Sequence, residues 1–166
     1  MTLRPRDAAV LIEVFEHVPD PVDLLKGIGK RLPSGGMLYL TTPNFNALSR
    51  WILGGDWSVL NREHVTLATA RGLGLALKEA GFQTLSIRSR NLNVAEIRYH
   101  LRARRRSGSS SAQEEKAPLD RHQAAADLRD RIEASPGLQF LKGIVNAGLG
   151  LTGTGDTLAA WARKGG

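Results

Sequence analysis

The chain has 166 residues, of which 42% are apolar, so it can bury the core of one domain of ordinary size, and this excludes a largely disordered protein. It contains no cysteine, which excludes disulfides, zinc–thiolate centres and thiol nucleophiles. The net charge is +7, and most of the excess comes from the arginines between positions 98 and 106, where there is no acidic residue. Because there is no apolar run of about 20 residues and no signal peptide, we expect a cytoplasmic protein without a transmembrane segment.

The first predicted elements form a strand–helix–strand unit. Residues 8–14 are almost all apolar, as in a parallel strand that is covered on both faces. A helix is predicted next, with Asp20 as its N-cap and Pro21 in its first position, and the segment 33–36 ends it. Residues 37–41 supply a second buried strand. Strand, helix and strand within about 35 residues are typical of a βαβ unit.

A second helix and a third strand continue the alternation. Thr69 is predicted to cap a helix that ends at Gly81, and residues 82–87 alternate as a strand. The expected fold class is therefore α/β, with a partial Rossmann-like, doubly wound sheet.

Residues 94–150 interrupt this alternation with the arginine-rich stretch, a Ser/Gly linker and two predicted helices, at 120–134 and at about 136–149. We interpret this segment as a basic helical insertion before a last strand at 157–162. That strand is expected to be antiparallel and at or near the edge of the sheet, because no helix follows it. The predicted divisions are an α/β core at 1–93, the insertion at 94–150 and the final strand of the core at 151–166.

Three residues that can carry chemistry follow the first strand. Glu13, Glu16 and His17 stand at its carboxyl end, which is the side on which open α/β sheets bind ligands. If the chain turns helical there, their spacing places them on one face, where two carboxylates and an imidazole suit magnesium, manganese or zinc. The alternative is that Glu16 and His17 only cap the loop by hydrogen bonds to the backbone, and the three residues alone leave both readings open.

Several motifs resemble one known family. Residues 7–21 read DAAVLIEVFEHVPDP, which resembles the fourth-strand segment D-x-V-x-x-x-E-V-L-E-H-V-x-D-P of the class I S-adenosylmethionine-dependent methyltransferases. LPSGG at 32–36 and LTTPN at 40–44 are similar to the turn and the fifth strand that follow in that family. A further set of residues resembles one branch of the family, which includes the ubiquinone-biosynthesis O-methyltransferases. These residues are Trp57, His64, Thr69, the AGF at 80–82 and the GDTL at 155–158.

The resemblance implies an enzyme that transfers a methyl group from S-adenosyl-L-methionine to a small-molecule acceptor. It implies that Ile12 and Glu13 contact this cofactor, and that Glu13, Glu16 and His17 bind a divalent metal such as magnesium. It also implies that His17 and His64 act as catalytic groups that help to remove a proton from the acceptor.

The chain departs from the family at its beginning. A full member starts with a strand, a glycine-rich turn and a helix that grip the cofactor, and here only six residues precede Asp7. We therefore expect the carboxyl-terminal half of such an enzyme, weak or inactive by itself. The G-x-G-x-x-G at 148–153 follows a predicted helix instead of a strand, so a helix end explains it better.

Two other interpretations stay open. The arginines at 98–106 can bind phosphates, so the alternative function is a non-catalytic module that binds RNA or an anionic surface. Aromatic side chains that read bases are absent around these arginines, and this disfavours nucleic acid as the partner. A partner chain that completes the sheet is the other, because the missing strands leave an open edge. Trp51 and Trp57 either wall an aromatic acceptor or, more commonly for tryptophans near a loop, anchor packing.

Overall fold

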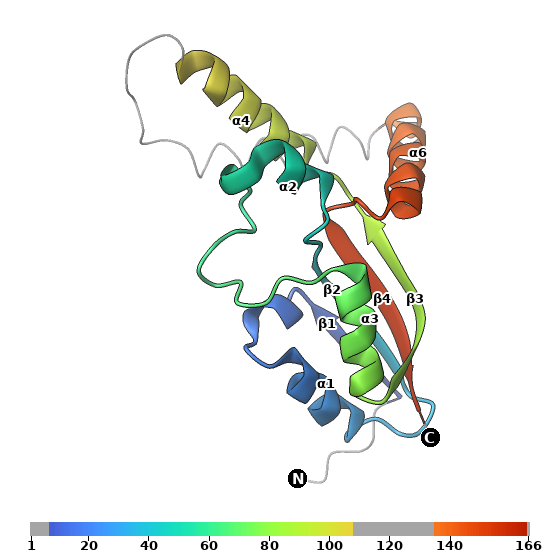
Figure 1. The fold of residues 1–166 in the computed structure, drawn as a ribbon. Coiled ribbons are helices and arrows are strands. Elements are labelled where there is room, and N and C mark those ends of the chain that lie inside the picture. The colour runs from blue at the N-terminus through green and yellow to red at the C-terminus, as the bar shows by residue number, and fades with distance from the viewer. Residues whose placement is uncertain (1–6, 108–134, 166) are drawn as a thin grey trace.

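The computed structural model describes residues 7–107 and 135–165. Its centre is a sheet with the strand order β1 (Ala8–Ile12), β2 (Met37–Pro43), β4 (Thr157–Lys164) and β3 (Phe82–Arg90) (Figure 1). β1 and β2 are parallel, and β4 runs antiparallel to both of its neighbours. β1, β2 and β3 therefore point the same way, and the predicted α/β class is confirmed.

The last strand lies inside the sheet. Its antiparallel direction is confirmed, and so is a position near the edge, although β4 is not the edge strand itself, because it pairs with β2 on one side and with the edge strand β3 on the other. Leu158, Ala160 and Ala162 are at most 1% exposed, as expected for a strand with two neighbours. The absence of a following helix indicated the direction of β4, but it carried no information about which strands β4 would separate.

Two helices cover one face of the sheet, α1 (Pro21–Gly29) and α3 (Ala70–Glu79), and they contact each other (Figure 1). The predicted caps are confirmed, since the Asp20 carboxylate accepts a hydrogen bond from the Asp23 N–H and the Thr69 hydroxyl accepts one from the Gly72 N–H. Between these helices and the sheet lies a core of fully buried leucines: Leu25, Leu38, Leu40, Leu73, Leu77 and Leu158.

The opposite face of β1 is open among the described residues. The sequence predicts that this strand is covered on both faces, which is wrong here, because Val10 and Ile12 are 62% and 63% exposed. The register continues the row of Val10 across the sheet to Tyr39 and Trp161, whose ring centroids lie 4.6 Å apart. An apolar run indicates that a strand is to be buried, but it does not say which segment covers it.

A second, smaller core lies beyond the carboxyl ends of the parallel strands, where α2 (Leu48–Leu53), η2 (Gly54–Asp56) and α4 (Val94–Ser107) meet (Figure 1). Trp57 is 2% exposed in it and acts as a packing anchor, whereas Trp51 is 71% exposed. The residues of this core are Ala47, Leu53 and Trp57, with Phe45, Val59 and Ile97 against them.

The last described helix, α6 (Pro136–Thr152), packs beside β3, where the Ser89 hydroxyl donates to the Leu149 carbonyl at 2.7 Å. Gly153 ends this helix in a left-handed conformation, so the glycines at 148–153 form a helix C-terminus, as the sequence predicts. The helix predicted at 120–134 and most of the Ser/Gly linker lie outside the described residues. Among the helices that the structure describes, none is long and apolar enough to cross a membrane.

Candidate functional site

The site lies where the chain leaves β1. Glu13 has a φ of 52°, a left-handed conformation that turns the chain out of the strand. Its N–H still donates to the Thr41 carbonyl at 3.1 Å, which holds this turn beside β2. The short helix η1 (Phe15–His17) follows, and Phe15, only 2% exposed, fixes it in the core. The segment that carries Glu13, Glu16 and His17 therefore stands at the carboxyl ends of two parallel strands, as predicted.

The Glu16 side chain is buried beneath this turn, with 1% exposure. Thr42, fully buried on β2, donates its hydroxyl proton to Glu16 Oε2 at 3.0 Å. Glu16 Oε1 is also buried and has no hydrogen bond among the described residues. Because an unsatisfied buried polar atom costs about 1–3 kcal/mol, this oxygen is a candidate ligand atom.

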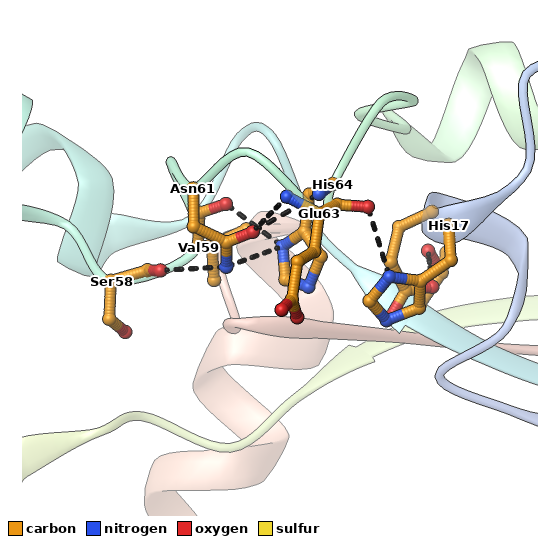
Figure 2. Close-up of polar contacts among 8 residues, drawn as sticks. His17, Ser58, Val59, Asn61, Glu63 and His64 are labelled. Atoms are coloured by element: carbon orange, nitrogen blue, oxygen red, sulfur yellow. Dashed lines mark hydrogen bonds and ion pairs between the residues drawn. The ribbon is translucent and has the colours of Figure 1, made fainter.

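Two backbone carbonyls fix the two histidines of the site in the same tautomer. His17 Nδ1 lies 3.0 Å from the Glu63 carbonyl oxygen, and His64 Nδ1 lies 2.9 Å from that of Val59 (Figure 2). A carbonyl can only accept, so each Nδ1 carries a proton and donates it. For His64 this contact is shorter than the 3.5 Å between its Nδ1 and the side-chain amide nitrogen of Asn61, which is also a donor. When the rings are neutral, each Nε2 therefore presents a lone pair.

The two imidazoles lie close to the buried carboxylate. His17 Nε2 is 4.0 Å from Glu16 Oε1, and the two imidazole rings meet edge to face with their centroids 4.8 Å apart. One ligand atom from each of Glu16, His17 and His64 lies within 4.8 Å of the others. The sequence nominates His64 as a catalytic group, but nothing in it shows that His64 reaches Glu16.

Glu13 lies beside this cluster without belonging to its three converging atoms. Partial burial of its carboxyl raises the pKa of Glu13 above its usual value, and the neighbouring Glu16 carboxylate raises it further. Glu13 therefore keeps its proton to a higher pH than an ordinary glutamate does.

The loop that carries His64 is shaped by Asn61, whose side-chain oxygen accepts hydrogen bonds from the N–H groups of Glu63 and His64 at 2.8 and 3.1 Å (Figure 2). The Thr66 N–H donates to the Glu16 carbonyl at 3.0 Å, which ties this loop to η1. Thr42, Asn61 and Thr66 are not among the site residues that the sequence motifs nominate. For Asn61 a signal exists, because an asparagine two or three residues before a functional group is typical of a turn of this kind.

The donor set fits a divalent metal, because imidazole nitrogens and a carboxylate oxygen are the ligands of zinc-type ions and Glu16 offers an unpartnered oxygen. The surface beside it suits an apolar ligand, since Ile12 and Val14 are 63% and 38% exposed at the end of β1. In the described ranges, no glycine-rich turn joins a parallel strand to a helix next to this surface.

The arginine-rich helix α4 is partly engaged in internal contacts. Arg104 donates to the Leu53 carbonyl at 3.0 Å and to the Asp56 carboxylate at 2.9 Å, which joins α4 to η2. Arg98 and Arg102 are exposed, while the side chains of Arg105 and Arg106 lie outside the described part. At least one of the five arginines therefore supports the fold, and the RNA or anionic-surface alternative gains no support.

Comparison with known proteins points to one family. Residues 3–87, half of the chain, match the family described as "Methyltransferase domain". The chain is 39% identical over 59 residues to the ubiquinone biosynthesis O-methyltransferase of Idiomarina loihiensis, a match that covers 36% of this chain and 22% of that protein.

Solved structures share the fold at low sequence identity. Phosphoethanolamine N-methyltransferase 2 of Haemonchus contortus, in complex with S-adenosyl-L-methionine, has a TM-score of 0.51 at 16% identity, with 96% of this chain and 33% of that one covered. A protein of Galdieria sulphuraria assigned as a sarcosine dimethylglycine methyltransferase has a TM-score of 0.50 at 17% identity, with 96% and 53% covered. The chain thus spans about half of one of these two solved chains and a third of the other.

Proposed function

This chain belongs to the methyltransferase domain family, the class I S-adenosylmethionine-dependent methyltransferases, and we propose that it contributes the acceptor side of a site that methylates a small molecule. The observation that carries this proposal is the convergence of Glu16, His17 and His64 beside the exposed Ile12 at the carboxyl ends of β1 and β2. Open α/β sheets bind their ligands at this edge.

On the donor side, we assign Ile12 and Glu13. S-adenosylmethionine supplies a methyl group on a sulfonium, which is already activated for displacement. Ile12 offers an exposed apolar surface to the donor, and Glu13 offers a carboxyl that turns out of the strand beside it. The protein then contributes mainly alignment of donor and acceptor, which supplies about 7–11 kcal/mol of barrier reduction in favourable cases.

On the acceptor side, we assign His17 and His64. Their Nε2 lone pairs are oriented by the hydrogen bonds at Nδ1, so either ring can accept the proton of an acceptor hydroxyl in a general-base role. The same lone pairs, with Glu16, can instead hold a divalent ion such as magnesium or zinc, which would favour the deprotonated form of the acceptor.

The proposal also accounts for the open edge of β1. Val10 and Ile12 are uncovered by any described segment, and β1 is paired only with β2 in the described residues. We propose that a further segment or a partner chain completes the sheet here, as unpaired strand edges readily add a strand. The described residues alone should then bind the donor weakly.

A titration of the isotope-labelled chain with S-adenosylhomocysteine, followed by amide NMR, tests the proposal. Chemical-shift changes should cluster at residues 12–17, with an affinity weaker than micromolar. The Ile12→Arg variant should abolish them. Val10→Arg is the matched control, because Val10 lies two residues away on the same exposed face of β1. No shift at saturating ligand, or shifts confined to another surface, would contradict the proposed function.

A further inference from the structure

A buried glutamate of the arginine-rich helix holds the loop that carries His64. Glu96 lies in the first turn of α4 and is only 7% exposed. We propose that Glu96 is a positioning residue for His64: its carboxylate fixes the beginning of the loop, and the loop in turn sets the orientation of the His64 imidazole. This deepens the proposed function and rests on it, because there His64 is a base on the acceptor side.

The contact between the helix and the loop is made to the backbone. The Ser58 N–H donates to Glu96 Oε1 at 2.7 Å. A hydrogen bond to a carboxylate is about twice as strong as one between neutral groups. Ser58 directly follows Trp57, the buried anchor of the smaller core, and Ile97 packs against the same core from α4. The first turn of α4 therefore fixes the beginning of the loop by one apolar and one polar contact.

Short links lead from this contact to the His64 ring (Figure 2). The Ser58 carbonyl accepts a hydrogen bond from the Asn61 side-chain amide at 3.2 Å, and the Asn61 side-chain oxygen accepts one from the His64 N–H at 3.1 Å. The next carbonyl along the chain, that of Val59, accepts the proton of His64 Nδ1 at 2.9 Å. Because Ser58 and Val59 are consecutive, a displacement of Ser58 moves both of the groups that orient the ring.

The hydrogen bonds of Asn93 distinguish Glu96 from a residue that only caps its helix. Asn93 precedes α4, and its side-chain oxygen accepts from the Glu96 N–H at 3.1 Å, as an N-cap does. In a capping box, the glutamate three residues on would bond back to the N–H of the cap residue. Here the Asn93 N–H donates to the Asp156 carboxylate instead. Glu96 Oε1 is therefore not needed for the cap, and it bonds to Ser58.

Asp156 fixes the start of α4 to the sheet. It directly precedes β4, whose first residue, Thr157, pairs with Pro43 at the carboxyl end of β2. The Asp156 carboxylate also accepts the hydroxyl proton of Ser49 on α2 at 2.8 Å. Glu96 thus reaches the loop from a helix that is attached to the same edge of the sheet as the site, and a rigid support of this kind is what a positioned side chain needs.

The test compares three variants of the full chain with the wild type by NMR, without any ligand. Glu96→Leu removes the acceptor at similar size, and Glu96→Gln keeps a neutral acceptor. Arg104→Met is the matched control, because it removes different hydrogen bonds between α4 and the residues around the smaller core.

The first readout is hydrogen exchange of the Ser58 N–H. We expect Glu96→Gln to speed this exchange about fivefold, the factor expected when a hydrogen bond to a charged acceptor becomes one to a neutral acceptor. Glu96→Leu should speed it further, and Arg104→Met should leave it unchanged.

The second readout is the imidazole nitrogen resonances of His64 at alkaline pH, where imidazoles are neutral. The wild type should show one tautomer, with the proton on Nδ1. Glu96→Leu should shift these resonances toward a mixture of tautomers, whereas Glu96→Gln should keep most of the wild-type signature and Arg104→Met all of it. A purely structural role of Glu96 would lower the stability without changing the tautomer. In the Glu96 variants, the resonances of His100 show whether α4 is still in place.

Two results would overturn the proposal. One is a His64 signature that Glu96→Leu leaves unchanged, since the contact then does not reach the ring. The other is an equal change in Arg104→Met, since general loosening of α4 then explains the effect. If Glu96→Leu does not fold, Glu96→Gln decides alone, because the proposal requires faster exchange of both the Ser58 and the His64 amide. All of these readouts are made without ligand, so their failure is distinct from a failure of the S-adenosylhomocysteine titration.

Discussion

The hydrogen bond between Thr42 and Glu16 offers a direct test of how the site is built. Thr42 is fully buried on β2, and its hydroxyl is the donor that Glu16 Oε2 finds at 3.0 Å. The substitution Thr42→Val keeps the shape of the side chain and removes this donor. The Glu16 carboxylate then stays buried with neither oxygen bonded to a hydroxyl.

The expected cost follows from the charge of the acceptor. A hydrogen bond to a charged group contributes about 1.5–3 kcal/mol, whereas a bond between neutral groups contributes about 0.5–1.5 kcal/mol. For a chain of this size, each kcal/mol corresponds to about 2–4 °C in the melting temperature, so Thr42→Val should lower it by about 3–12 °C.

The assay is thermal and urea denaturation, both followed by far-UV circular dichroism, with two comparison variants. Thr66→Val removes a hydroxyl that donates to the neutral carbonyl of Val18, the residue after η1, so its cost should be clearly smaller. Thr42→Ser keeps the hydroxyl and loses only a buried methyl, worth about 0.8 kcal/mol. If Thr42→Val costs no more than Thr66→Val, then Thr42 does not support a buried carboxylate and the reasoning is refuted.

Three further predictions test the fold. Leu38→Ala, at a fully buried position in the core, should cost about 2–5 kcal/mol in urea denaturation. Gly155→Ala places a Cβ 2.7 Å from the Arg90 carbonyl oxygen and should cost on the order of 1–3 kcal/mol, whereas Gly137→Ala, with open space around it, should not destabilise. Burial raises the pKa of Asp156 above its ordinary 3.8, so the native state loses stability as the pH rises from 3.8 through the raised pKa. Asp156→Asn has no carboxyl to deprotonate, so its stability should rise relative to the wild type as the pH is increased above 3.8 in a series of urea denaturation curves.

The local elements of this fold are readable from the sequence because their causes are local. Asp20 and Thr69 cap the helices at which they were predicted, since a side chain and an N–H a few residues on make each cap. β1, however, ends at Ile12 and not at residue 14, because Glu13 adopts a left-handed conformation that a run of apolar residues does not reveal.

The rest depends on pairings between distant segments. The position of β4 between β2 and β3 is set by competition among strand pairings, which the pattern of β4 alone does not encode. The same limit applies to the site. The sequence identifies Glu16 and His17 as neighbours, but the approach of His64 requires the loop hydrogen bonds of Asn61 and Thr66, which appear only once the loop is folded.

The open face of β1 links stability to the site. Covering the side chains of Val10 and Ile12 would gain about 1.5–3 kcal/mol for each one fully buried, and this gain would fall on the strand that leads into Glu13. Whatever covers this face therefore stabilises the turn that aims Glu13 and positions Glu16. A ligand that binds only the ordered turn uses part of its binding free energy to order that turn. When the face is covered and the turn is already ordered, this cost is absent, so the ligand must bind more tightly. Donor affinity and the thermal stability of β1 should consequently rise together, and a covering segment that raised one without the other would not be acting through this turn.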